Sequence, residues 1–517
     1  MFDPDWWRGA VIYQIYPRSF LDTNSSGIGD LSGITQKLPY IAELGVDGIW
    51  ISPFFKSPMK DFGYDVSDYR DIDPMFGTLA DFDALLAKAH ELGLKIIIDL
   101  VLSHTSNQHP WFLDPDKKDW YVWATEKPDG QLPNNWVSVF GGVAWEWDNR
   151  YGQYYLHNFL KEQPDLNYHN PEVQEEALNI CRFWLERGVD GFRLDVINFL
   201  FHDEELRDNP PRAPELGAAT QFEGQDPYST QTHIFDKSRP ENLVFLTRLR
   251  KLLDEYGAMS VGEIGDDHPY ERSHEYTAGD KYLHTAYNTH MMGGTRKHLS
   301  ASTIREPIEE FRKLSGEAEA SWPSWAFSNH DVVRAASRWL PDSDGFSHDP
   351  DFSKMLIALL GCLYGTVFLY QGEELGLPEA HIPFEAIKDP WGIHTWPEWQ
   401  GRDGCRTPIP WSAIPPSKSW LPMPEEHFRL NAEDQEKQAG SVLHFTRAFL
   451  KWRKEQIALW RGDIRFIDTN DDHLLAFERT TDDKTVLCMF NFSADEKTYG
   501  DITLAPFGFH LDGFNAN

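Results

Sequence analysis

Separated segments of the chain place acidic, basic and imidazole side chains directly after short apolar runs. They carry three carboxylates, Asp195, Glu263 and Asp331, and Arg193 stands two residues before the first of these. Two carboxyl groups that flank one bond are the equipment of glycosidic cleavage, in which one attacks the sugar carbon and the other protonates the leaving oxygen. Arg193 should hold Asp195 ionised as the nucleophile. Glu263 has no cation beside it in sequence, so we expect it to be the proton donor with a raised pKa.

Bringing these segments together requires a scaffold of repeated units. Apolar runs alternate with helical periodicity, and continuous runs are typical of parallel strands covered on both faces. The expected strands are Val11–Tyr16, Asp47–Ser52, Lys95–Leu102, Gly191–Val196, Met259–Ile264, a segment near Leu283–Asn288, Ser324–Ser328 and Thr366–Tyr370. The expected helices are Leu31–Leu44, Leu79–Leu92, Pro171–Arg187, Leu243–Tyr256, Ile304–Leu314, Phe352–Leu363 and a long one over Asp434–Leu459. About eight βα units favour an α/β fold of the (β/α)8 TIM-barrel type over a doubly wound sheet, with the polar strand ends at one face.

Three stretches without helical period interrupt this alternation, and each follows an expected strand. They cover 104–167, Asn198–Arg239 and Gly372–Leu430. Loops of this length are functional excursions or small subdomains. All three should therefore lie at the carboxyl face of the barrel.

The same pattern predicts the division into domains. We expect the barrel, domain A, over 1–103 and 168–459, with a loop-rich domain B over 104–167 inserted after the third strand. Short alternating runs after residue 460 predict a small antiparallel β domain, domain C, over 460–517.

Composition narrows the class of partner. The formal net charge is −33, from 81 acidic and 48 basic residues. Such a field repels phosphate backbones and anionic membranes, so we expect no nucleic acid and no membrane among the partners. Solubility or a salty habitat explains the charge equally well.

Cysteine usage and the chain start predict a cytoplasmic protein. The four cysteines form no C-x-x-C pair and are expected to be reduced and buried. The first residues lack the basic and apolar regions of a signal peptide. The apolar run Met355–Tyr370 is shorter than the ~20 residues of a membrane span and is interrupted by glycines. We interpret it as a buried helix, a turn and a buried strand, and expect a monomer or homodimer.

The motifs resemble those of the α-amylase family of glycoside hydrolases, family 13, and its oligo-1,6-glucosidase/α-glucosidase branch. The similarity is carried by Asp99–His104, Gly191–Asp195, Gly262–Ile264, Ser328–Asp331 and the branch motif Gln163–Asn167, and also by Val11–Phe20 and Gly63–Tyr69. The insertion Asn198–Arg239 looks more like proteobacterial α-glucosidases with high transfer activity.

This resemblance implies a pocket for one terminal glucose. Asp331 would be a third carboxylate that grips sugar hydroxyls. The implied substrate-binding residues are Asp61, Tyr64, His104, Phe140, Phe159, Arg193, His330 and Arg402. A pair between Asp61 and Arg402 would block the far end and explain exo action. For Phe140 and Phe159 a role as ordinary core aromatics stays open.

The resemblance also implies a structural Ca²⁺ or Mg²⁺ and no cofactor for catalysis. The loop after the first strand supplies Asp22, Asn24, Ser26, Ile28 and Asp30. Alternating oxygen ligands suit a hard cation, although Ser26 stands where a third acidic side chain is usual. A plain Asx/Gly turn is the alternative.

These inferences predict a retaining exo-acting α-glucosidase that releases glucose from short α-glucosides, with transglucosylation. A sucrose isomerase or transglucosidase of the same fold stays open, since it shares the glucosyl-enzyme intermediate. Val196, next to the expected nucleophile, resembles the residue found at this position in α-1,6-preferring members. One side chain does not decide the linkage.

Two alternatives from other classes fit the sequence less well. A metal-dependent hydrolase using His104, His330, Asp195 and Glu263 as ligands is opposed by the fixed charge of Arg193. Non-catalytic, transporter-associated relatives lack the catalytic pair, which this sequence has.

Overall fold

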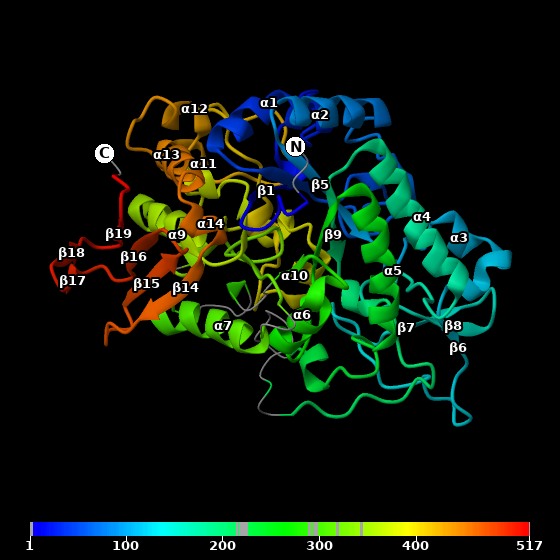
Figure 1. Ribbon diagram of the computed structural model, residues 1–517. Helices are drawn as coiled ribbons and strands as arrows, with labels where there is room; N and C mark the ends of the chain where they lie inside the picture. The colour runs from blue at the N-terminus through cyan, green and yellow to red at the C-terminus, as the bar shows by residue number, and fades with distance from the viewer. Residues whose placement is uncertain are drawn as a thin grey trace.

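A ring of eight parallel strands forms the centre of the computed structural model, which describes residues 4–213, 216, 226–287, 291–292, 298–316, 320–341 and 345–515 (Figure 1). The strands are β1 Val11–Ile15, β2 Gly48–Ile51, β5 Lys95–Val101, β9 Gly191–Asp195, β10 Met259–Gly262, β11 Thr285–Ala286, β12 Ser324–Ala326 and β13 Thr366–Tyr370. Their order is β11-β10-β9-β5-β2-β1-β13-β12, and a parallel bridge between Tyr287 and Ser324 joins the two ends. The predicted (β/α)8 barrel is confirmed. Asn288, at the end of the sixth expected strand, lies outside the described residues.

Helices pack around this ring (Figure 1). They are α1 Leu31–Leu44, α2 Leu79–Glu91, α4 Pro171–Arg187, α5 Glu241–Tyr256, α6 Pro269–Thr277, α7 Ala301–Leu314, α8 Ala335–Arg338 and α9 Pro350–Cys362. Helix α4 shows why the ends fall where they do. The Asn170 side chain accepts from the Glu172 N–H, Pro171 occupies the first turn, and Gly188 ends the helix with a φ of 104°.

Alternate residues of the barrel strands belong to two different apolar clusters. On β5, Ile96 and Ile98 pack in the large outer cluster with helix residues. Ile97 instead packs with Trp50 and Phe368 inside the ring. Asp99 continues the inward face of Ile97 two residues further along the strand. The barrel is therefore filled by apolar side chains below and opens onto charged ones at its carboxyl end.

The segment between β5 and α4 forms a small sheet of its own. It contains β6 Trp123–Ala124, β7 Trp145–Asp148 and β8 Gln153–Leu156 in the order β6-β8-β7, with the short helix α3 Pro110–Leu113 before them. Trp136 and Trp145 are buried in its separate apolar cluster. A two-stranded sheet, β3 Phe55–Lys56 and β4 Asp68–Ile72, lies after β2.

The C-terminal part is antiparallel, as predicted. Its four-stranded sheet consists of β14 Asp463–Ile467, β15 Leu474–Thr480, β16 Thr485–Asn491 and β19 Phe509–Leu511, beside a hairpin of β17 Lys497–Tyr499 and β18 Ile502–Leu504. Figure 1 shows this sheet and the strands β6–β8 on opposite sides of the barrel.

The prediction of one long helix over Asp434–Leu459 was wrong. The structure has α12 Ala432–Gln435, α13 Val442–Lys454 and α14 Ile457–Arg461, after α10 Pro390–Thr395 and α11 Glu425–Arg429 in the preceding loop. Ser441 accepts a hydrogen bond from the His444 N–H and starts α13 anew. A capping serine after Gly440 favours a new helix over continuation.

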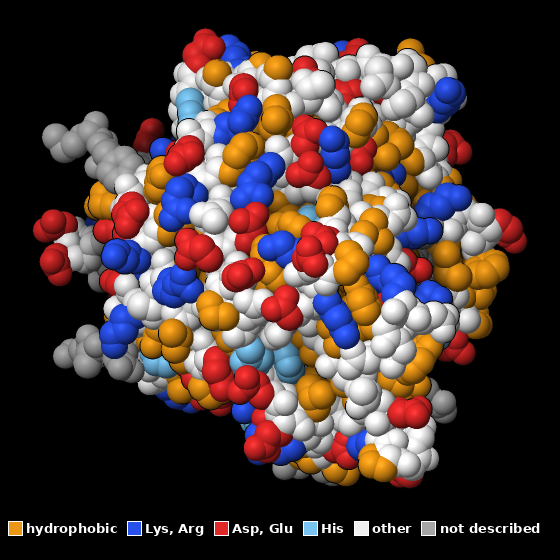
Figure 2. Space-filling view, turned by 90° about the vertical axis from the view of Figure 1, so that its right-hand side faces the viewer, with side chains coloured by type: hydrophobic (Ala, Val, Ile, Leu, Met, Phe, Trp, Pro, Cys, Tyr) orange, Lys and Arg blue, Asp and Glu red, His pale blue; other side chains and the backbone are white. Residues whose placement is uncertain are grey.

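The surface and the thiols agree with the composition. On the face shown in Figure 2, acidic and basic side chains are interspersed. All four cysteines are buried and free. Within the described ranges, no helix is both long and apolar enough to cross a membrane.

Candidate active site

One buried guanidinium joins the catalytic candidates at the carboxyl end of the barrel. Arg193 on β9 is 1% exposed. Its Nη1 lies 2.9 Å from Asp99 Oδ1 and 2.6 Å from Asp195 Oδ1, and its Nη2 lies 2.7 Å from Glu263 Oε2. Asp195 and Glu263 therefore share one cation, although they come from different strands. The charged groups predicted from separate segments meet at one site.

The ionisation of the two acids differs from the expectation in one respect. Glu263 has a cation beside it after all, because Arg193 reaches it from the neighbouring strand. Burial raises the pKa of Glu263 to about 8 and that of Asp195 to about 7, while Arg193 opposes the rise in both. Burial thus outweighs the guanidinium at Asp195. Burial shifts both carboxyl groups in the same direction, and one proton held between them leaves one acid to donate and one carboxylate to attack.

Asp331 lies in a more cationic environment. Its Oδ1 is 2.8 Å from Arg406 Nη2 and 3.2 Å from Arg402 Nη1, and its Oδ2 is 3.0 Å from His330 Nε2. Burial alone would raise its pKa, but the hydrogen bond from the His330 Nε2–H and the charges of the two arginines hold the pKa of Asp331 well below its usual range. This carboxylate is ionised and available as a hydrogen-bond acceptor.

Arg402 joins a further chain of polar contacts next to Asp331. Arg402 Nη2 lies 3.1 Å from Asp61 Oδ1 and 2.7 Å from Asp389 Oδ1. Gln163 donates from Nε2 to Asp61 Oδ2 at 3.2 Å, and the same atom is 3.1 Å from His104 Nε2. The Asp61–Arg402 contact expected from the resemblance is present.

The two histidines are neutral. Burial lowers the pKa of His104 to about 4 and that of His330 well below its usual value. Gln14 Nε2 lies 2.7 Å from His330 Nδ1, so the proton of His330 is on Nε2, facing Tyr64 Oη at 2.5 Å and Asp331. Tyr64 in turn donates to Asp99 Oδ2 at 3.1 Å. The predicted polar residues form one connected network.

Aromatic rings line the same region. Phe159 lies 5.3 Å from the His104 ring and 5.6 Å from Phe140, measured between ring centroids. The Arg402 guanidinium is 5.2 Å from the centroid of Phe140. Both phenylalanines thus contact residues of the site.

Three contributors were absent from the sequence prediction of individual site residues. Arg406, Asp389 and Gln163 hold Asp331, Arg402 and Asp61, respectively. Gln163 belongs to the branch motif, which was a usable signal. Asp389 and Arg406 lie in the irregular Gly372–Leu430 stretch, where no periodicity indicates which charges are buried.

The insertion after β9 is tied to the loop that follows Glu263. Arg212 Nη1 lies 2.7 Å from Asp267 Oδ1, and Ser238 donates to Asp266. Asn198 Nδ2 donates to the carbonyl of Gly265 at 2.8 Å. These bonds fix the segment just beyond the acid/base candidate.

The loop proposed to hold a metal ion folds through its own hydrogen bonds. Asp22 accepts from the backbone N–H groups of Asn24, Ser26 and Gly27. Asp30 accepts from Thr23 and caps α1 through Gly33 N. The donor set, which is all oxygen, suits a hard cation. The described residues contain no group of three or more His, Cys, Asp or Glu that could hold a metal, so the ion stays a prediction.

Comparisons with known proteins agree with this geometry. Residues 14–462 match the alpha-amylase catalytic-domain family. A probable alpha-glucosidase of Rhizobium meliloti is 54% identical over 509 residues, covering 96% of this chain and 91% of the relative. An oligo-1,6-glucosidase of Parageobacillus thermoglucosidasius is 35% identical over 528 residues, covering 95% and 91%.

Solved structures show the same likeness. The alpha-glucosyl transfer enzyme XgtA superposes with a TM-score of 0.93 at 50% identity, covering 98% of this chain and 99% of that one. The trehalulose synthase MutB of Pseudomonas mesoacidophila MX-45 gives 0.86 at 30% identity, covering 98% and 99%. The match spans the barrel and the carboxyl cluster together, and the chain belongs to the alpha-amylase family of glycoside hydrolases.

Proposed function

We propose that this glycoside hydrolase is a retaining, exo-acting α-glucosidase. The contact of one guanidinium with both Asp195 and Glu263 is the observation that carries the proposal. Retaining glycosidases place their two carboxyl groups ~5–5.5 Å apart, whereas inverting ones leave ~6.5–9.5 Å for a water molecule. Two acids held by the adjacent nitrogens of one guanidinium are close enough for the shorter spacing.

The reaction follows from the ionisation of these groups. The Asp195 carboxylate attacks the anomeric carbon while Glu263 donates its proton to the leaving oxygen, which breaks the glycosidic bond and forms a glucosyl ester. Glu263, now ionised, takes a proton from water, and the water oxygen displaces Asp195 to release glucose. Asp331, His104 and His330 hold hydroxyls of the same ring during both steps.

Exo action is supported by the ion pair between Arg402 and Asp61. Arg402 and Asp61, braced by Asp389 and Gln163, form a wall beyond the ring that the acids hold. One glucose at a non-reducing end fits against such a wall, and a continuous chain does not. The phenylalanines 140 and 159 pack against His104 and Arg402 and serve as its sides.

Transglucosylation is part of the proposal, because a sugar hydroxyl can replace water in the second step. The similarity to an alpha-glucosyl transfer enzyme supports it. A sucrose isomerase is the second candidate, favoured by the similarity to a trehalulose synthase, although that identity is only 30%. The linkage, α-1,4 or α-1,6, stays open at Val196, which stands next to the nucleophile and donates its N–H to Glu263 Oε2 at 3.2 Å.

The deciding experiment is a panel of maltose, isomaltose, sucrose, trehalose and soluble starch, with products followed over time. We expect release of α-glucose from one or both of the first two, and transfer products at high substrate concentration. The anomer is read by NMR before mutarotation. Fast depolymerisation of starch would contradict exo action, and β-glucose would contradict retention.

Four further expectations complete the proposal. They are the division into domains at residues 104, 168 and 460, a structural Ca²⁺ or Mg²⁺ at the loop of Asp22 and Asp30, a cytoplasmic location, and a monomeric or homodimeric state. The −33 charge and the small neutral substrate of the related glucosidases support the absence of nucleic-acid partners.

A further inference from the structure

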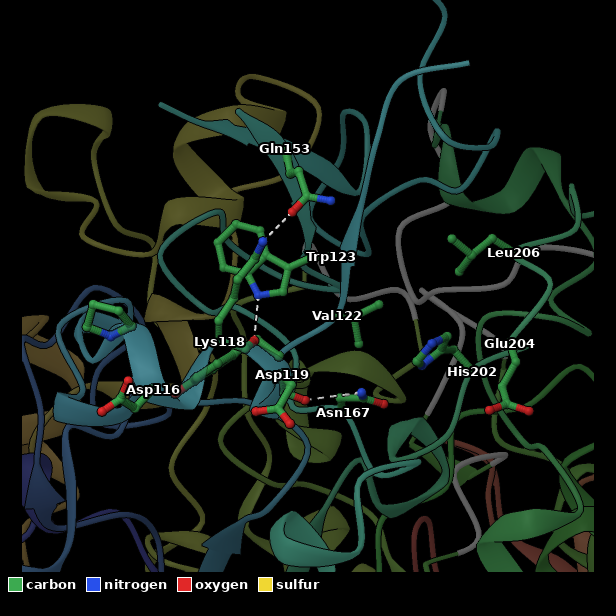
Figure 3. A pocket seen from close by; sticks show the side chains of 12 residues that line it. Asp116, Lys118, Asp119, Val122, Trp123, Gln153, Asn167, His202, Glu204 and Leu206 are labelled. Atoms are coloured by element: carbon green, nitrogen blue, oxygen red, sulfur yellow. Dashed lines mark hydrogen bonds between the residues drawn. The ribbon is translucent and has the colours of Figure 1, made fainter. Parts of the chain in front are cut away.

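A groove of about 650 Å³ lies on the inserted segment, apart from the carboxyl cluster. One wall consists of the 3-10 helix Pro115–Trp120 with β6 and β8, and the other of residues 202–206 after β9 (Figure 3). Among the described residues that line it, none contacts Arg193 or Arg402 through an ion pair. The catalytic proposal leaves this groove without a role.

His202 is a polar side chain of this groove whose ring forms no hydrogen bond within the described residues. Its side chain is 9% exposed and lines the groove, facing Val122 and Asn167 in Figure 3. Its ring packs edge-on against Trp136 and His169 at 6.3 and 4.9 Å. Neither ring nitrogen has a hydrogen-bond partner in the described part of the chain. The ring is buried as a whole, but its nitrogens reach the groove, where a molecule that enters can bond them.

The ionisation of His202 restricts that partner. Burial lowers the pKa of His202 to about 3, so the imidazole is neutral and offers one donor and one acceptor. A neutral imidazole complements a hydroxyl, which also donates and accepts.

The remaining walls have the same mixed character. Asp116 and Asp119 present carboxylates, and Gln153 presents its amide nitrogen, since its oxygen accepts from Lys118. The Asn167 amide is engaged with the Asp119 carbonyl and the His169 N–H. The indole of Trp123 is half-buried and stacked on Phe112 at 5.8 Å with an interplanar angle of 6°. A rigid aromatic surface beside convergent polar groups is the usual composition of a site for a neutral, partly apolar ligand.

Anions and metal ions fit poorly. An anion would meet Asp116, Asp119 and Glu204, and the ammonium of Lys118 is already bonded to Gln153. A metal ion lacks ligands, because the described residues provide no group of three His, Cys, Asp or Glu able to hold one.

From this chemistry we propose that the groove between the inserted segment and residues 202–206 is a second, non-catalytic site for a neutral sugar. The His202 ring, the Gln153 amide nitrogen and the Asp116 carboxylate bond its hydroxyls, and Trp123 supports its apolar face. The proposal goes beyond the catalytic function and depends on neither its mechanism nor its linkage.

The test counts bound sugar by equilibrium dialysis with radiolabelled maltose. The full chain carries Asp195→Ala throughout, so that the probe is not consumed. We expect two maltose molecules per chain at saturation. Adding His202→Phe, which keeps the ring packing but removes both polar nitrogens, should leave one. Adding Asp116→Trp, at the exposed rim, should block the groove and also leave one, with the fold preserved.

The matched control is Trp147→Ala, an aromatic on β7 that is 43% exposed and does not line the groove. It should retain two bound molecules. Equal stoichiometry in the parent and both groove variants, whether one or two, would overturn the proposal. One molecule in the parent and none in the groove variants would support it and contradict the proposed catalytic pocket instead.

Discussion

Arg193 and Arg479 are both fully buried arginines, yet their surroundings are opposite. Arg193 touches three carboxyl groups at the open end of the barrel. Arg479 on β15 donates instead to the backbone carbonyls of five residues, which are Cys362, Leu363, Leu459, Gly462 and Asp463, at 2.7–3.2 Å. Several of these carbonyls end α9 and α14, where a cation is favoured by the helix dipole. Arg479 thereby joins the C-terminal sheet to the barrel.

The ionisation of the two groups follows from these partners. Burial lowers the pKa of Arg479 to about 10. Burial would also lower the pKa of Arg193, but its carboxylates raise it well above the ordinary value. Neutral carbonyls are therefore enough to hold a buried arginine whose role is to join two parts of the fold. Gathering several acids around one charge costs more than an apolar core would, which is reasonable only where those acids do chemistry.

The largest expected effect comes from the acids that Arg193 holds. Asp195→Ala and Glu263→Gln should each lower kcat on the order of 10⁴-fold or more, because each removes a group that reacts directly. Thermal unfolding should show the fold intact. Near-native kcat in either variant would reject the assigned roles.

The arginines themselves test the comparison through matched substitutions. Arg193→Met should reduce kcat/KM by about 10²–10³-fold, the usual cost of losing one preorganised electrostatic partner. Steady-state kinetics and the unfolding midpoint are measured on the same preparation. A variant that loses stability but keeps its activity would show that Arg193, like Arg479, has a structural role.

Arg479→Met should show the reverse pattern. Five carbonyls lose their donor in the interior, so the free energy of unfolding should fall by about 3 kcal/mol or more. The kcat of the folded fraction should stay within about two-fold of the parent value, since the active site is elsewhere. Loss of kcat without loss of stability would show that the contact between the C-terminal sheet and the barrel influences the active site.

The pH dependence of kcat/KM tests the ionisation of the two acids that share Arg193. Below about 7 the pair of Asp195 and Glu263 takes up a second proton and loses its nucleophile, and above about 8 it loses the proton that it must donate. We expect a bell-shaped dependence of kcat/KM with its maximum between these values; its limbs belong to the coupled pair. With an activated substrate that needs no acid, Glu263→Gln should lose the basic limb and keep the acidic one. Persistence of both limbs would assign the basic limb to another group.

The sequence was informative where a single strand carries the signal. Asp99, Arg193 and Asp195 could be placed because continuous apolar runs define parallel strands and a period of two defines the inward face. The cation beside Glu263 could not, because its partner lies on the neighbouring strand and adjacency across a sheet leaves no trace in linear spacing. Asp389 and Arg406 were missed for a related reason. They lie in an irregular loop, where burial is decided by tertiary packing alone.

The smallest expected effect concerns Asp22 and Asp30, two carboxylates that form no ion pair with an arginine in the described structure. In the described structure, Asp22 and Asp30 are bonded only to N–H and O–H groups of their own loop and of α1. If a cation serves them, it comes from solution. Ca²⁺ should then raise the unfolding midpoint of the parent by a few degrees through binding to the folded state, with kcat unchanged. The rise should vanish in Asp22→Ala and persist in Asp114→Ala, a control whose carboxylate likewise caps a turn. A chelator that abolishes activity, with recovery on adding Zn²⁺, would instead favour a metal-dependent hydrolase. The acids around Arg193 would then be metal ligands, as those of this loop are proposed to be.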